Sequence, residues 1–241
     1  KSQIYVTFLG GDKHDGLSVD TEAYEIWSEL LEKDRILACD KKDNFWEMGA
    51  AGPCGPCSEI HIDLRDQSER NEVDGISLVN KDHPQVIEVW NSVFMEYNRK
   101  ADGSLHPLSE KHIDTGMGLE RLAMILQNKK SNYNSDVFSP LIQKVETLSQ
   151  KNYNSDAASL DPVTVAMRVI VDHIRAIAFS IADGQLPSNT GAGYVIRRIL
   201  RRAVRYGYQT LNLKEPFLYE LVEVLAIQFD GVFPELEKQK E

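Results

Sequence analysis

The 241-residue sequence contains few cysteines and no long apolar run. Three cysteines are too few for the disulfide framework of a small secreted domain. No segment approaches the ~18 uninterrupted apolar residues that read as a membrane-spanning helix, so we expect no membrane span. The first residues, Lys1-Ser-Gln-Ile, include neither an initiator methionine nor the pattern of a secretory signal peptide. We therefore expect a segment of a longer, cytoplasmic protein.

Positive charge is also scarce. The chain has 27 lysines and arginines against 37 aspartates and glutamates, which gives a formal net charge of -10. A chain this acidic is not built as a bulk nucleic-acid binder, so DNA is not an expected partner and any RNA contact requires a local basic surface. Hydrophobic residues make up 42% and charged residues 27%, the mix of a globular protein with a core. The sequence shows no internal repeat.

The two halves of the sequence differ in their periodicity, which predicts an α+β fold in two domains. Residues 1–130 carry the β-branched and aromatic runs of a sheet, and residues 131–241 carry helical periods. We expect strands at 3–9, 35–39, 86–97, 105–108 and 111–114, and helices at 21–31, 135–149, 162–182, 193–208 and 215–229. The polar residues 64–84 predict a surface insertion, and residues 149–161 predict a linker.

Residues 111–126 contain the most informative pattern. They predict a strand that ends at Asp114, a glycine turn at Gly116 and Gly118, and then a helix. The first N–H groups of such a helix can bind an anion. An ordinary strand–turn–helix packed on a sheet explains the same residues. The helix would bury one apolar face, formed by Leu119, Leu122, Ala123 and Leu126.

Residues 43–61 allow two interpretations. Cys54, Cys57 and His61 suggest a zinc site, but a structural zinc ion needs four ligands, and Cys39 would supply the fourth only through the fold. Two Gly-Pro steps favour the alternative, a rigid loop. We expect no metal ligand in this chain.

The strand at 86–97 places a polar residue, Asn91, among aliphatic neighbours. Strict alternation would place Asn91 on one face with Ile87, Val89, Val93 and Met95. A buried asparagine needs hydrogen-bond partners. Asn91 would therefore either form hydrogen bonds with the backbone in the core or line a binding pocket.

The helices after residue 128 include one with an arginine face. At 100° per residue, one half of the helix at 193–208 carries Arg197, Arg198, Arg201, Arg202 and Arg205. The other half would be buried and carries Val195, Ile196, Ile199, Leu200, Ala203, Val204 and Tyr206. Such an arginine face is either solvated or paired with carboxylates, or it binds phosphates. In the helix at 162–182, His173 lies on the apolar stripe and is expected to be a hydrogen-bonded core residue.

Three stretches resemble the class II aminoacyl-tRNA synthetases, in the form found in alanyl-tRNA synthetases. Asp-Thr-Gly-Met-Gly-Leu-Glu-Arg at 114–121 resembles motif 3, and residues 43–61 resemble another part of the catalytic domain. Gly-Tyr-Val-Ile-Arg-Arg-Ile-Leu-Arg-Arg-Ala-Val-Arg at 193–205 resembles the helical tRNA-recognition domain. The sequence departs from the family at Ala50 and Ala51, where Asp-Thr is usual, and at Ala192, where many relatives have arginine.

The resemblance implies ATP-dependent activation of alanine to alanyl-adenylate, then transfer to tRNA(Ala), with Mg²⁺ accompanying ATP. Asp114 and Arg121 would be the catalytic residues, with Asp114 holding the substrate ammonium. The pocket would be lined by Trp46, Asn91, Val93, Asp114 and Gly116. ATP would contact Gly118 and Arg121. The tRNA would contact Asn189, Arg197, Arg201 and Arg205.

The resemblance also implies what the 241 residues do not contain. The sheet would be part of a class II antiparallel β-sheet with flanking helices, followed by an all-helical domain. Motifs 1 and 2 would precede Lys1, and zinc would be expected only in an editing domain that this sequence lacks. We therefore expect the isolated chain to be inactive. A non-catalytic paralogue that binds RNA is the alternative to a ligase.

Overall fold

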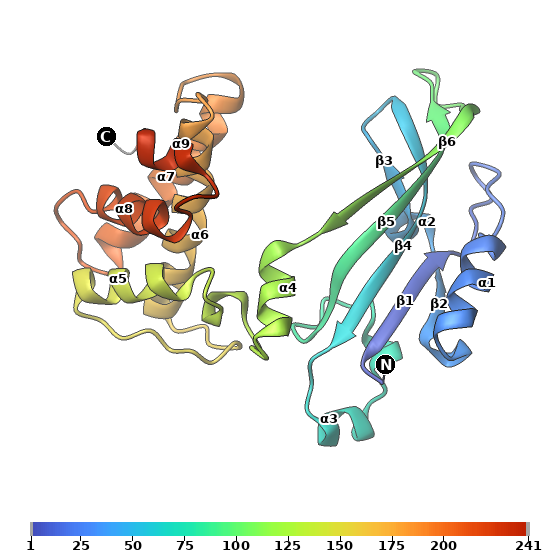
Figure 1. The fold of residues 1–241 in the computed structure, drawn as a ribbon, viewed down its shortest axis with the longest axis horizontal. Coiled ribbons are helices and arrows are strands. Elements are labelled where there is room, and N and C mark those ends of the chain that lie inside the picture. Colours follow the sequence, from blue (N-terminus) through green and yellow to red (C-terminus); the bar gives the residue numbers. More distant parts are fainter. Residues whose placement is uncertain (1, 240–241) are drawn as a thin grey trace. The chain divides into compact units, whose positions relative to one another are not determined.

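The computed structural model describes residues 2–239 (Figure 1). The chain divides into two compact units, Lys1–Leu122 and Ala123–Glu241. The first unit contains the β-sheet and the second is helical. The expected α+β class, with a mostly antiparallel sheet before the helices, is confirmed.

The sheet has six strands in the order β2-β1-β4-β5-β6, with β3 paired to β4. Only the β1–β2 pair is parallel, and the other pairs are antiparallel. Strand β6, green in Figure 1, therefore lies at one edge. The strands span β1 Ile4–Leu9, β2 Ile36–Cys39, β3 Phe45–Glu47, β4 Gly52–Asp63, β5 Val86–Arg99 and β6 Leu105–Met117.

The prediction of a rigid loop in residues 43–61 is wrong. This segment contains the short helix α2 (Lys41–Asn44), then β3 and the long inner strand β4. The second Gly-Pro step, Gly55-Pro56, lies at a β-bulge, where the register shifts between Cys54 and Cys57. A Cβ at Gly55 would lie 1.9 Å from the carbonyl oxygen of Phe94 on β5. The glycine is therefore required by the close approach of two strands.

Strand β6 continues where the sequence predicts a turn. It joins β5 through a hairpin turn, in which the Gly103 N–H donates to the carbonyl oxygen of Lys100 and Gly103 has φ +85°. It then runs without a break to Met117, so Asp114 does not end it and Gly116 lies inside it. Motif residues 114–117 are therefore fixed by pairing to β5.

Helices α1 and α4 bury fewer side chains than their apolar periods predict. Helix α1 (Thr21–Leu30) begins at Asp20, whose carboxylate accepts from the Ala23 N–H, and it buries only Ala23. Helix α4 (Leu119–Leu126) begins in the first unit and ends in the second, and Leu119 is 56% and Leu126 77% exposed. Periodicity identifies an apolar face but cannot show whether another segment covers it.

Residues 64–84 are more than a polar surface insertion. They contain α3 (Gln67–Glu72) and a 3-10 helix (Gly75–Leu78), and buried Val79 packs with Tyr5 and Val86 of the sheet. Arg65 anchors this segment through a buried ion pair, with Nη2 2.7 Å from Oδ2 of Asp63. The segment thus closes one end of the sheet, which its polar composition conceals.

The second unit surrounds one continuous apolar core. Helix α6 has the predicted bounds and starts at Asp161, which caps it by accepting from the Thr164 N–H. His173 Nδ1 lies 3.4 Å from Asp172, and the side chain is mostly buried. The sequence missed the last helix, which is only five residues long. The helices are α5 Ser139–Ser149, α6 Pro162–Ala182, α7 Gly191–Gln209, α8 Leu218–Gln228 and α9 Pro234–Lys238, with 3-10 turns at Lys33–Arg35 and Asn132–Asn134.

Among residues 2–239, no helix is both long and apolar enough to cross a membrane.

Candidate active site on the β-sheet

The sheet brings four of the predicted substrate-binding residues together on one face. Asn91 of β5 pairs with Gly116 of β6, and Val93 pairs with Asp114. Register partners point to the same side of a sheet, as do residues two apart on one strand. These four residues therefore share one surface, which we call the Asn91 face.

A second bulge changes which other residues lie on the Asn91 face. Ile60 pairs with Trp90 and His61 pairs with Glu88, so β5 has one extra residue, Val89. The predicted placement of Ile87 beside Asn91 is therefore wrong, and Glu88 takes its place. One extra residue reverses the alternation, and the residue types of β5 do not reveal it.

The space above Gly116 is open. A Cβ built on Gly116 meets nothing within 4 Å, and its φ lies outside the left-handed region. Neither backbone strain nor packing within the described chain therefore requires glycine at this position. Its neighbour Asp114 is exposed and accepts the Thr115 N–H at 2.8 Å, so the site can admit a small molecule beside a carboxylate.

The side chain of Asn91 lies beside the buried thiol of Cys57, on the same face of the sheet. The Asn91 amide is hydrogen-bonded to Cys57, whose pKa burial raises to about 12. Cys57 therefore remains a neutral thiol, and its Sγ lies 3.7 Å from the Asp43 carbonyl oxygen. The Oδ1 atom of Asn91 is buried and has no partner among the described residues. Asn91 thus offers an unused acceptor to the Asn91 face.

The residues of the zinc interpretation do not converge. Cys54 and Cys57 pair with different parts of β5, and His61 Nε2 lies 3.2 Å from the carboxylate of Glu59. Cys39 is also held as a thiol, because burial raises its pKa to about 11. Nothing in the described chain brings these four residues into one coordination sphere.

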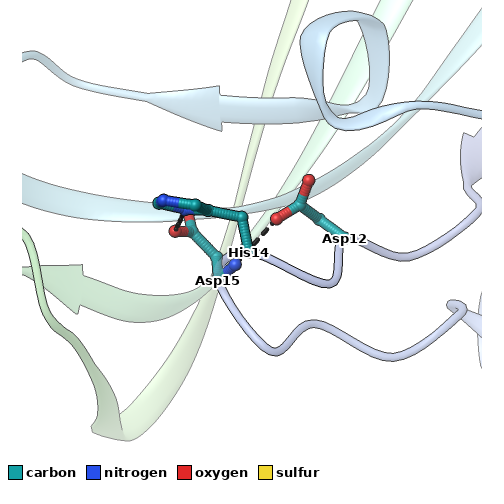
Figure 2. A group of neighbouring side chains, drawn as sticks. All are labelled: Asp12, His14 and Asp15. Atoms are coloured by element: carbon teal, nitrogen blue, oxygen red, sulfur yellow. Dashed lines mark hydrogen bonds and ion pairs between the residues drawn. The ribbon is translucent and has the colours of Figure 1, made fainter.

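Within residues 2–239, one group of acidic and histidine side chains has the spacing of a metal site: Asp12, His14 and Asp15 (Figure 2). Asp15 already pairs with Lys41 at 2.5 Å and Arg99 at 2.6 Å. Arg99 first and then Lys41 hold the pKa of Asp15 far below its usual value. This carboxylate therefore fastens the loop to β5 and already has two cationic partners.

The predicted ATP-binding residues, Gly118 and Arg121, contact the first residues of β5. Arg121 Nη1 donates to the Glu88 carbonyl oxygen at 2.6 Å and lies 3.5 Å from its carboxylate. The Gly118 N–H donates to Val89, so it is not part of a free anion-binding turn. Trp46 is half-buried on β3, opposite Gly55, and β4 separates it from Asn91.

Comparison with known proteins decides the family. The family model described as "tRNA synthetases class II (A)" matches residues 1–241. The chain belongs to this family. It is 61% identical over 241 residues to an alanine–tRNA ligase from Cytophaga hutchinsonii, 100% of this chain and 27% of that protein. It is 58% identical to the ligase from Flavobacterium psychrophilum, over 100% of this chain and 28% of that protein. It is 56% identical to the ligase from Porphyromonas gingivalis, over 99% of this chain and 27% of that protein.

The class II synthetase chain thus spans little more than a quarter of the length of these relatives. Its resemblance to the alanyl form of the family is confirmed along the whole sequence.

The helical unit of this synthetase chain displays the arginine face of α7. Along this open face the arginines lie together with Tyr194 and Tyr206 of the same helix. The guanidinium groups of Arg198 and Arg202 lie over these rings, each 5.9 Å from the ring centre. Arginines interleaved with aromatic rings are typical of nucleic-acid surfaces.

Within the described part of the chain, the arginines of α7 make contacts other than ion pairs. Within residues 2–239, none of the five forms an ion pair with a carboxylate. Arg197 instead donates to Asn189, and Arg205 Nε donates to Gln209 at 3.0 Å. The predicted carboxylate-paired alternative is therefore wrong for this surface.

Helix α7 buries less than the sequence predicts. Its buried stripe is narrow and rich in small residues, whereas Val195 is 59% exposed and Val204 is also exposed. Small residues allow close approach, since a Cβ at Gly207 would lie 2.4 Å from the Phe217 ring. The buried residues are Gly193, Ile196, Ala203 and Gly207. Most of the helix surface is therefore available to a partner.

Sequence reasoning missed a chain of buried polar groups beside Asn91. Asn44 donates to Thr7 at 2.9 Å and to the Cys57 carbonyl oxygen at 2.8 Å. Thr7 in turn donates to Glu59 at 3.3 Å. The sequence did contain one signal of this polar group, because Glu59 is a charged residue inside the inner strand β4. The prediction of a loop for residues 43–61 gave no reason to expect Glu59 to be buried.

Proposed function

We propose that this chain is the motif 3 part of the catalytic domain and the tRNA-recognition domain of an alanine–tRNA ligase. Such an enzyme joins the alanine carboxylate to the α-phosphate of ATP and then transfers the alanyl group to tRNA(Ala). Identities of 56–61% over almost the whole chain to proteins named as alanine–tRNA ligases support this assignment. The relatives compared are all named as ligases, so nothing favours a non-catalytic paralogue.

The observation that carries the proposal is the open space above the Asn91–Gly116 pair. The space adjoins the face that carries Asp114 and Val93, and a methyl group placed on Gly116 would meet nothing within 4 Å. Asp114 would bind the ammonium of alanine, and Asn91 and Val93 would line the pocket. Trp46 would join them at the margin of β4. Activation of this kind depends on positioning and charge stabilisation more than on a general base.

ATP would lie at the start of β5, against Arg121 and Gly118. The Arg121 guanidinium is half exposed and held by Glu88, which suits a polyphosphate accompanied by a divalent cation. Mg²⁺ bound to ATP would neutralise charge on the phosphates. The chain's own contribution is to hold Arg121 against Glu88 of β5. We place the enzyme in the cytoplasm.

The tRNA would bind along α7. Arg197, Arg201 and Arg205 would contact phosphates, and Asn189 would lie at the helix start, where Arg197 now holds it. The absence of carboxylate partners around these arginines, within the described residues, supports this placement. A local basic surface of this kind reconciles RNA binding with the acidic composition of the chain.

Alanine-dependent ATP–pyrophosphate exchange tests the proposal. We expect a longer protein that contains this chain and supplies motifs 1 and 2 to catalyse exchange with alanine, and to use serine and glycine less well. The pocket cannot exclude those two amino acids strongly, because differences of one small group give only about 10- to 200-fold discrimination. Exchange that depends on another amino acid, or no exchange in the longer protein, would overturn the assignment.

A further inference from the structure

Glu59 is a buried carboxylate whose one basic neighbour among the described residues is a histidine, His61. It lies on β4 with 8% of its surface exposed, and no lysine or arginine pairs with it among residues 2–239. A buried charge is costly unless it is compensated by a counter-ion or several hydrogen bonds. The described residues supply hydrogen bonds but no side chain that is always cationic.

The contacts of Glu59 all involve one oxygen. Oε2 accepts from Thr7 and from Asn80, each at 3.3 Å, and lies 3.2 Å from His61 Nε2. Asn44 fixes the Thr7 hydroxyl in turn. The other oxygen, Oε1, has no hydrogen bond in the described chain. The carboxylate is therefore held in one orientation with an unused acceptor.

The register places this acceptor next to the proposed alanine pocket. Thr7, Glu59, Asn91 and Gly116 are successive partners across β1, β4, β5 and β6, so all four point to the Asn91 face. Glu59 and Asp114 flank β5, and their strands are about 10 Å apart, two strand spacings. Between them lies the unpartnered Oδ1 of Asn91.

We propose that Glu59 binds the α-ammonium group of the amino-acid substrate, together with Asn91 and Asp114. The inference rests on the proposed function and adds a residue to its pocket. An ammonium has three N–H donors and no acceptor. The Asn91 face presents three oxygen acceptors along β4, β5 and β6. The ammonium also supplies the positive charge that Glu59 lacks.

This assignment predicts selectivity against substrates that lack the ammonium. A 2-hydroxy acid such as lactate has one donor and no charge at this position, so it leaves a buried carboxylate without compensation. The pocket would thereby distinguish amino acids from hydroxy acids. Gly116, in contrast, would select among amino acids by the size of the substrate side chain.

The decisive variant is Glu59→Gln in the longer protein. The glutamine oxygen can take the place of Oε2 and keep the bonds from Thr7 and Asn80. Its NH₂ group then replaces Oε1 and directs N–H groups at the ammonium. We expect the KM for alanine in exchange to rise roughly 10- to 100-fold, as for a lost hydrogen bond to a charged group. The KM for ATP should change by less than about twofold.

Two inhibitors separate ammonium binding from a general change of the pocket. Alaninol carries the ammonium but no carboxylate, so its inhibition constant should rise in parallel with the alanine KM. Lactate carries the carboxylate but no ammonium, so its inhibition constant should stay constant or fall. The matched control is Glu96→Gln, which removes the carboxylate that pairs with Lys111 beside α1 and should change neither KM.

A thermal melt accompanies each variant. If Glu59→Gln proves unstable, Glu59→Asp keeps the charge but draws the free oxygen back by one methylene, and should raise the alanine KM to a smaller extent. An unchanged alanine KM in a folded variant, or a change in the KM for ATP instead, would overturn the assignment. Wild-type exchange measured in the same series tests the proposed function separately.

Discussion

At the scale of single residues, Gly116 offers the sharpest test of the proposed alanine pocket. Within the described chain, neither packing nor backbone conformation requires glycine at this position. We expect Gly116→Ala to leave the melting temperature nearly unchanged, since the new methyl group enters open space. It should reduce alanine-dependent exchange by at least tenfold, because that methyl group occupies the place of the substrate. The matched control is Gly55→Ala, whose Cβ would lie 1.9 Å from a carbonyl oxygen and should prevent folding.

Asp114→Asn tests charge at the same place. Asp114 is exposed and accepts the Thr115 N–H, a bond that an asparagine oxygen can also accept. The variant should therefore fold normally. Loss of the ammonium partner should cost roughly 2–5 kcal/mol in activation, as for a broken buried charge pair. Unchanged exchange kinetics in the longer protein would show that Asp114 only shapes the end of β6.

The residues also show how far sequence reasoning reached. The family resemblance of the sequence predicted that Asn91, Val93, Asp114 and Gly116 line one pocket. The register of β5 and β6 does bring these four residues together. Glu59 was missed, because its position depends on pairing with β1 and β5, which are distant in sequence. Local patterns carry residue type, but long-range register decides which residues meet.

At the scale of elements, helix α7 separates RNA binding from a merely solvated surface. Changing Arg197, Arg201 and Arg205 together to Gln should weaken tRNA binding at low salt. The log–log slope of the binding constant against salt should flatten by about two units, since each lost phosphate contact removes roughly 0.7–0.9. The melting temperature should barely move, because these side chains form no ion pair with a carboxylate in the described chain.

The measurements are tRNA binding at several salt concentrations and a thermal melt of each variant. Tyr219→Ser provides the control, because Tyr219 is exposed on α8, away from α7 in the sequence. An unchanged salt slope in the triple variant would remove the phosphate contacts from α7 and leave RNA binding to another surface.

Elements were predicted unevenly, for physical reasons. The bounds of α6 were correct because a long apolar period is bracketed by Asp161 as a cap and a Gly at 184. Strand β4 was missed because two prolines and two glycines imitate a loop. Its β-structure comes from pairing on both sides, which overrides local preference.

At the scale of the whole molecule, we expect the 241 residues alone to lack exchange activity. The sequence contains no counterpart of motif 2, which by family resemblance supplies the arginine for the α-phosphate and the substrate carboxylate. Adding the preceding segment of the longer protein should restore activity. The measurement is pyrophosphate exchange with purified chains of both lengths, whose folding is first verified by circular dichroism. Robust exchange by the 241-residue chain would show that Arg121 suffices.

Strand β6 has a consequence for handling the purified chain. Thirteen residues form an edge of the sheet, and most of them are exposed, including the apolar Ile113. A free edge of this length presents unpaired backbone groups that another chain can complete. Solutions of the 241-residue chain should therefore associate as concentration rises, and light scattering should report a growing mean particle mass. Stock concentration and storage time thus become experimental variables. The Ile113→Pro variant should associate less during storage.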